Sequence, residues 1–252
     1  MSSMVDHLVA QVLALHIRLI ACHERLAAST DSEALHDLRT TVRRLRSLLR
    51  PLRDLPGVAE LEAAAKAVGE LTTPLRDREV LAARLARQGY DVAADTRIKK
   101  VNQAWSRVAD SAEVTRLLEM LDQFPGFVRV QQRQQLLGGL RKSIEKAMDK
   151  QWKQLRKAIA DPAHDRHRLR LLIKRVRYAA DAYPELSHQP KKMQSRLKAA
   201  QGELGNWHDH LQWLAQAGQQ SDLAPCIAGW QLGIVRTEKK ADIALERLNK
   251  AC

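Results

Sequence analysis

Apolar residues recur at helical spacing along almost the whole chain, and this periodicity constrains the fold more than any other feature. Only 4% of the 252 residues are aromatic, and Gly (11) and Pro (8) are few, so an all-β fold lacks its usual strand and turn residues. Hydrophobic residues make up 45% of the chain, which excludes disorder and suits one large or two small domains. We therefore expect an all-α protein.

Capping residues, Gly and Pro set the expected helix boundaries. Thr30 with Glu33 is typical of a capping box, and Thr73 before Pro74 is typical of a helix start. The segment FPGFVRV at 124–130 is the best break in the middle of the chain. Helices are expected over 5–27, from Thr30 to near Leu52, after Gly57, from Thr73 to Gly89, within 91–122, and over 131–160, 164–183, 190–204, 206–219 and 222–250.

The two halves of the chain share a motif. Segments starting at His36 and His167 both read H-x-x-R-x-x-x-[RK]-R-x-R, offset by 131 residues (167 − 36). Farther on, Arg76-Asp77-Arg78 matches His208-Asp209-His210 at an offset of 132 (208 − 76). We interpret this as an internal duplication within a single domain over 1–252. Half 1 covers about 1–123 and half 2 about 131–252, joined by 124–130.

The motif places cations on one face of a helix. At ~100° per residue the basic positions fall within an arc of ~80°, opposite Leu38, Val42 and Leu45. The stripe comprises His36, Arg39, Arg43, Arg46 and Arg50 in the first copy, and His167, Arg170, Lys174 and Arg177 in the second. Each pair of neighbouring like charges destabilises a helix by roughly 0.2–0.5 kcal/mol. A one-sign stripe made twice is suited to holding a linear polyanion, whereas a solvent-exposed Arg face is the simpler alternative.

The overall charge agrees with an anionic partner. The formal net charge is +13, which favours nucleic acid, an anionic membrane or a phosphate polymer. The start MSSMVDH has no positive n-region, and Leu8–Cys22 is interrupted by polar residues, so we expect no signal peptide and no membrane span. Cys22, Cys226 and Cys252 form no zinc-binding spacing, which favours a reducing cytoplasm.

The Asp of each three-residue match admits two interpretations. Asp209 between two His side chains is typical of a metal site. The matching Arg76-Asp77-Arg78 cannot bind a cation, so an Asp that orients a neighbouring Arg or His fits both halves better. No nucleophile with a base recurs and no Gly-rich phosphate loop is present. We expect no catalytic residue, no metal and no cofactor, and we assign the remaining His residues to the surface or the core.

Four segments together resemble the CHAD family, the conserved histidine α-helical domain. They are LHDLRTTVRRLRSLL at 35–49, LTTPLRDREVLAARL at 71–85, HRLRLLIKRVRYAADAY at 167–183 and LKAAQGELGNWHDHLQWL at 197–214. The resemblance implies two pseudo-symmetric antiparallel helical bundles that bind inorganic polyphosphate in a basic cavity or groove where the halves face each other. Thr40, Thr72 and Asp181 depart from the usual family residues. No β-rich segment resembles the CYTH-type domain often fused to this family, so its catalytic activity is not transferred.

The resemblance also implies which residues bind. The family's basic and histidine positions fall on His36, Arg39, Arg43, Arg44, Arg46, His167, Arg170, Lys174, Arg175 and Arg177, with weaker matches at Arg76, Lys198 and His208. Charge and expected helix face add Arg18, Arg50 and Arg141.

We therefore expect a non-catalytic polyphosphate binder, located in the cytoplasm and attached to polyphosphate granules. The first alternative is a protein that binds the nucleic-acid backbone, although the motif helices lack the aromatic platforms on which single strands stack. The second is a phosphatase or metal-dependent phosphohydrolase that uses His and Asp. The third is a scaffold whose partner is another protein.

Overall fold

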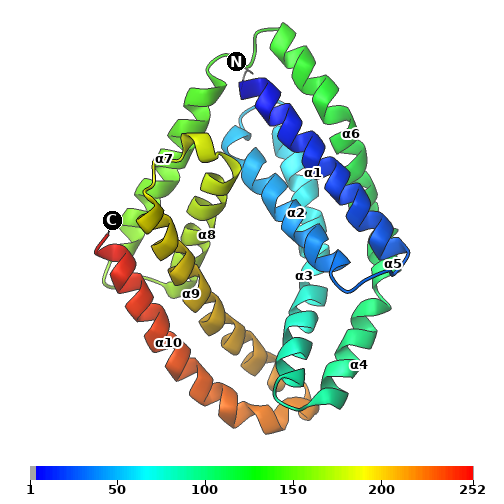
Figure 1. Ribbon diagram of the computed structural model, residues 1–252, viewed down its shortest axis with the longest axis vertical. Helices are drawn as coiled ribbons and strands as arrows, with labels where there is room; N and C mark the ends of the chain where they lie inside the picture. The colour runs from blue at the N-terminus through cyan, green and yellow to red at the C-terminus, as the bar shows by residue number, and fades with distance from the viewer. Residues whose placement is uncertain (1–3, 252) are drawn as a thin grey trace. The chain divides into compact units, whose positions relative to one another are not determined.

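The computed structural model describes residues 4–251, and within them the chain is built of helices without a β-strand, as the periodicity predicts (Figure 1). The α-helices are α1 (Met4–Ala27), α2 (Ala34–Leu49), α3 (Val58–Ala86), α4 (Asp91–Asn102), α5 (Trp105–Ala109), α6 (Ala112–Arg133), α7 (Leu140–Ile159), α8 (Arg166–Ala182), α9 (Lys191–Ala217) and α10 (Ile227–Asn249). Short 3₁₀ helices are η1 (Arg50–Leu52), η2 (Pro184–Leu186) and η3 (Ser221–Cys226). The expectation for Cys252 lies outside the described residues.

The chain divides into two compact units, Met1–Ile144 and Glu145–Cys252. The break expected at 124–130 instead lies inside α6, with Pro125 in the helix interior. Phe124 and Val128 are both buried and lie one turn apart, so packing of this face keeps α6 helical through the proline. The chain turns later, at 134–139, where Gln135 and Gly139 both have positive φ. The duplication itself stays a prediction.

In unit 1, α1 packs against α2, α5 and α6, and α3 packs against α2, α4 and α6. The side of α2 expected to be apolar is buried: Leu38, Val42, Leu45 and Leu49 are each at most 2% exposed. Burying a side chain of this size contributes roughly 1.5–3 kcal/mol, so packing fixes the rotation of α2. The basic stripe is thereby turned away from this core.

Three further expected boundaries are wrong. Thr30 and Glu33 form no capping box; instead the Asp31 carboxylate accepts a hydrogen bond from the Glu33 backbone N–H at 2.9 Å. Pro74 lies inside the continuous helix α3 rather than at a helix start. Buried Leu61, Val68 and Leu75 share one side of α3, and their packing outweighs the missing proline donor. In the same way α9 runs through 204–206 without a break.

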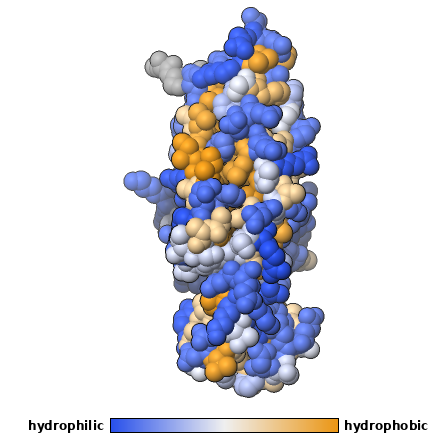
Figure 2. Space-filling model, turned by 90° about the vertical axis from the view of Figure 1, so that its right-hand side faces the viewer, coloured by the Kyte–Doolittle hydropathy of each residue, from blue (hydrophilic) through white to orange (hydrophobic). Residues whose placement is uncertain are grey.

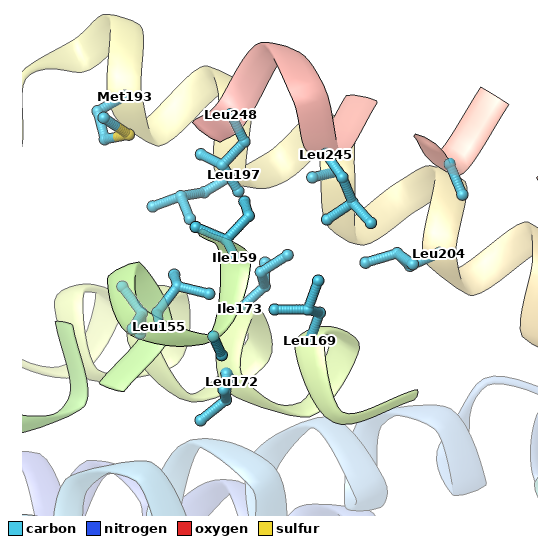
Figure 3. Packing of buried hydrophobic residues seen from close by; sticks show 14 residues of the cluster. Leu155, Ile159, Leu169, Leu172, Ile173, Met193, Leu197, Leu204, Leu245 and Leu248 are labelled. Carbon is cyan, nitrogen blue, oxygen red and sulfur yellow. The ribbon is translucent and has the colours of Figure 1, made fainter. Parts of the chain in front are cut away.

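In unit 2, α9 packs against both α8 and α10. A hydrophobic cluster joins these helices to the end of α7, with Leu155, Leu169, Leu197 and Leu245 among its members (Figure 3). Asp165 caps α8, because its carboxylate accepts a hydrogen bond from the His167 backbone N–H at 2.8 Å. The basic stripe of α8 begins directly after this cap.

Helix α1 differs from expectation in its hydropathy. Within the described residues it is the one helix long and apolar enough to cross a membrane, with a mean hydropathy of 1.5 over 18 residues. The core helix of a soluble protein meets the same criterion, and α1 buries nine residues, including Leu8, Val12 and Leu19. Its outer side exposes Leu13 and Ile17. Figure 2 shows apolar side chains gathered on the side of unit 1 where α1 and α6 lie in Figure 1.

Candidate anion-binding site

The basic stripe of α2 lies on the side of the helix opposite the buried leucines. His36, Arg39, Arg46 and Arg50 are half-buried and Arg43 is exposed. Arg44, Arg18 on α1 and Arg141 in the first turn of α7 are also exposed. Of these three, Arg44 lies on α2 but outside the stripe, and the other two lie on other helices.

Arg39 is docked on the turn of α3 that precedes Pro74. Its guanidinium donates hydrogen bonds to the Gly69 carbonyl (3.0 Å), to the Thr72 hydroxyl (2.8 Å) and to the Thr73 hydroxyl (3.2 Å). Burial lowers the pKa of the Arg39 guanidinium, although the group stays charged at any physiological pH. Arg39 therefore ties α2 to α3 in addition to contributing charge.

A buried carboxylate, Glu62 of α3, faces three arginines. Arg46 Nε donates to Glu62 Oε1 at 3.0 Å, Arg53 Nη2 donates to Oε2, and Arg50 Nη2 lies 4.0 Å from Oε1. Burial alone would raise the pKa of this carboxyl, but the hydrogen bonds from Arg53 and Arg46 outweigh burial and the pKa is lowered. Glu62 is thus ionised and neutralises part of the stripe. Glu62 was not predicted as a site residue, and its one signal in the sequence is an acid on the apolar side of a helix.

Arg76 has a carboxylate partner, Glu79, that was not predicted from the sequence. Its Nη1 donates to Glu79 Oε2 at 2.9 Å, one turn along α3. Glu79 is 9% exposed, and burial raises the pKa of its carboxyl above the ordinary value. The hydrogen bond from Arg76 and the charge of His36 act in the opposite direction but are outweighed by burial. His36 and Arg76, expected on separate motifs, therefore share one acidic neighbour.

In unit 2, the two remaining signatures meet. The rings of His167 on α8 and His208 on α9 are 5.5 Å apart between centroids. Burial, followed by the charges of Arg170, His167 and Lys174, lowers the pKa of His208 to about 4. Four sequence-predicted residues thus gather on one side of the α8–α9 pair, and His208 is neutral at pH 7.

The next stripe residue, Arg177, is held by a neutral partner. Its Nη1 donates to Gln201 Oε1 at 2.8 Å, and Gln201 Nε2 donates to the Tyr178 hydroxyl at 3.3 Å. Gln201 lies within the fourth signature segment but was not predicted as a site residue. Arg175 on α8 and Lys198 on α9 are exposed.

His208 and His210 point to different neighbours, since residues two apart on a helix diverge by ~200°. His210 Nδ1 lies 2.8 Å from the Asn206 carbonyl, and its ring lies against α10 at Gly233, where a Cβ atom would approach it to 2.5 Å. Within residues 4–251, no group of three or more His, Cys, Asp or Glu side chains could hold a metal.

The comparisons with known proteins agree with this arrangement of helices. A sequence model of the CHAD domain matches residues 11–217, which is most of the chain. The chain belongs to the CHAD family. The crystal structure of the CHAD domain from the plant Ricinus communis is similar, with a TM-score of 0.74 and 20% sequence identity. The similarity covers 99% of this CHAD domain and 91% of the plant chain, and it shows a shared fold. No curated protein matches the sequence.

Proposed function

We propose that this CHAD domain binds inorganic polyphosphate without turning it over, and that the basic faces of α2 and α8 both take part. The observation that carries the proposal is the meeting of His167, Arg170, Lys174 and His208 on the α8–α9 pair. Two cations beside a pair of imidazole rings offer phosphate oxygens both positive charge and hydrogen-bond donors. Arginine forks match phosphate oxygens, and a neutral His208 can donate a hydrogen bond to them.

Polyphosphate fits these faces better than nucleic acid does. Single strands are held largely by stacking on aromatic side chains. Helix α2 has no aromatic residue, and the one aromatic residue of α8, Tyr178, is half-buried and accepts a hydrogen bond from Gln201. A chain of phosphates needs only the charges and donors that the two helices supply.

The test is a titration with long-chain polyphosphate over a range of salt concentrations, with tRNA as competitor. Affinity should fall steeply with salt, because each phosphate contact releases counterions. Polyphosphate should displace tRNA at matched charge far better than the reverse. If tRNA wins at physiological salt, the protein is a nucleic-acid binder.

Charge reversal separates the basic faces from the overall charge. Arg43→Glu, Arg170→Glu and Lys174→Glu combined should abolish binding while helicity is retained. The matched control reverses Arg87, Arg236 and Lys239, which are exposed and lie outside α2 and α8. Equal losses in the two triple variants would contradict the assigned faces and leave only a non-specific charge effect. Retained binding in the first variant would favour a protein scaffold.

The absence of catalysis is part of the proposal. Pure protein incubated with polyphosphate, with and without divalent metal, should release no phosphate. Steady turnover that is lost in His36→Ala and His208→Ala would establish a phosphohydrolase instead.

We also propose a cytoplasmic location on polyphosphate granules. A fluorescent fusion should coincide with stained granules and become diffuse in the triple variant Arg43→Glu, Arg170→Glu, Lys174→Glu. A diffuse wild-type fusion in cells that contain granules would contradict this location.

A further inference from the structure

A groove of 540 Å³ lies within unit 2, between the C-terminal half of α8, η2 and the first turns of α9. Three cations line it: Arg177 from α8, and Lys191 and Lys198 from α9. One carboxylate, Asp181, also lines it, so these four groups carry a net charge of +2. Lys191 is not part of either repeated motif, and nothing in the motif assigns the groove a role.

The groove continues the basic stripe of α8. Arg177 is both the last cation of the stripe and a wall of the groove. The next position on the stripe, one turn farther, is Asp181, whose carboxylate repels an anion that follows α8 straight on. The cations beyond Arg177 lie instead on α9, at Lys198 and Lys191. Beyond Arg177, the row of cations therefore continues on α9 and not along α8.

Hydrogen-bond donors also line the groove between α8 and α9. Arg177 is oriented by its hydrogen bond to Gln201, which leaves the rest of its guanidinium fork for other acceptors. Ser195 lines the same groove and adds a neutral donor beside the lysines, as does Gln194, one of whose Nε2 hydrogens is bonded to the Gln189 carbonyl at 3.1 Å. Lysine side chains are flexible point charges, suited to following a chain rather than fixing one phosphate.

We propose that this groove is an extension subsite, which takes the phosphates of a long polyphosphate chain beyond those held at His167–Lys174. This inference rests on the proposed function. From His167 to Arg177, where the stripe meets the groove, the helix rises about 15 Å, at 1.5 Å per residue. A short polyphosphate held beside His167 and His208 does not reach the groove, whereas a long chain occupies both. The subsite therefore makes the protein prefer long chains.

The experiment compares Lys191→Glu with Lys192→Glu, using long-chain polyphosphate and tripolyphosphate as ligands. The two lysines are adjacent and exposed, and Lys192 does not line the groove. Lys191→Glu should weaken binding of the long chain about tenfold, the value of one charge-assisted contact, and leave tripolyphosphate binding unchanged. Lys192→Glu should have a clearly smaller effect on the long chain. Asp181→Asn should strengthen long-chain binding.

Two failures are distinguishable. If the wild-type protein binds neither ligand, the proposed function is wrong and this inference falls with it. If the wild type binds both ligands but Lys191→Glu and Lys192→Glu weaken the long chain equally, the extension subsite is wrong and the proposed function stands. Equal loss of both ligands in Lys191→Glu would place Lys191 in the primary site and overturn the subsite.

Discussion

The stripes of α2 and α8 carry the same motif in different surroundings. Arg46 and Arg177 hold matching positions, 131 residues apart (177 − 46), yet Arg46 is bound by the carboxylate of Glu62 and Arg177 by the amide of Gln201. A carboxylate cancels charge as it orients an arginine, whereas an amide orients it and leaves the charge intact. The same sequence pattern therefore places Arg46 of α2 against a carboxylate and Arg177 of α8 against a neutral amide.

The second matched pair differs in the same direction. Arg76 is paired with Glu79. At the corresponding position, His208 stands against His167 with Arg170 and Lys174 nearby. In unit 1, Arg39 and Arg46 of α2 therefore bind groups of α3 and hold the two helices together. In unit 2, Arg166 at the start of α8 is bound by the carboxylates of Glu238 and Asp242, whereas Arg177 farther along the helix is bound by the neutral amide of Gln201. We expect unit 2 to contribute more to binding.

The largest expected effect is a difference between two matched double variants. Lys174→Gln with Arg177→Gln should weaken polyphosphate binding about 100-fold, since two charge-assisted contacts of ~1.5–3 kcal/mol are lost. Arg43→Gln with Arg46→Gln, at the corresponding positions, should weaken it only about tenfold, because Glu62 already offsets Arg46. Calorimetric titration at fixed salt measures both. Equal losses would mean that the carboxylate of unit 1 does not matter for binding.

A single substitution gives Arg177 the kind of carboxylate partner that Arg46 has. Gln201→Glu places a carboxylate against Arg177, as Glu62 stands against Arg46, and should weaken binding about tenfold by cancelling one cation. Gln231→Glu on α10 makes the same charge change at an exposed position away from α8 and serves as the control. The measurement is the dissociation constant of each variant for long-chain polyphosphate.

The reverse substitution, Glu62→Gln, provides an independent check. It leaves Arg46, Arg50 and Arg53 without their shared carboxylate, so the free energy of unfolding should fall by about 1–3 kcal/mol. Binding should strengthen, because the face of α2 gains one net positive charge. A variant that is less stable and also binds more weakly would contradict this balance.

These partners mark the limit of what the sequence could predict. Periodicity identified most helices and the buried side of α2, because both follow from spacing along one helix. The breaks expected at Pro74 and at 124–130 were wrong, because packing of Leu75 and of Phe124 with Val128 keeps α3 and α6 helical.

The candidate site shows the same limit. His167 and His208 were both expected to bind, yet their contact depends on how α9 packs on α8, which spacing does not reveal. Glu62, Glu79 and Gln201 were missed because each acts from a neighbouring helix or turn and belongs to no repeated pattern. Spacing along one helix predicts which cations share a face, but not which groups on other helices neutralise or orient them.

One part of the pH dependence of stability should come from His208 in unit 2. His208 has a pKa of about 4 in the folded protein against an ordinary value of 6.5. Between these values the unfolded chain binds more protons, so the free energy of unfolding falls as the pH is lowered from about 6.5 toward 4. Chemical denaturation across this range should show a shallower fall for His208→Gln than for the wild type. His188→Gln, the same substitution at an exposed position, serves as the control. Arg76, the counterpart in unit 1, adds no such slope, because an arginine does not titrate there.

The smallest expected effect concerns the anchoring of Arg39. Thr72 is fully buried, accepts a hydrogen bond from Arg39 and donates one to the Val68 carbonyl. Thr72→Val keeps the shape but removes both bonds, so the free energy of unfolding should fall by about 1 kcal/mol. Polyphosphate affinity should stay unchanged, because Arg39 retains its charge and its bonds to Gly69 and Thr73. Thr96→Val on α4, whose hydroxyl bonds only its own helix at an exposed position, is the control. A loss of affinity in Thr72→Val without a change in stability would show that the orientation of Arg39 matters for binding. In that case α2 would bind polyphosphate as well as anchor α3, and the difference proposed between α2 and α8 would be wrong.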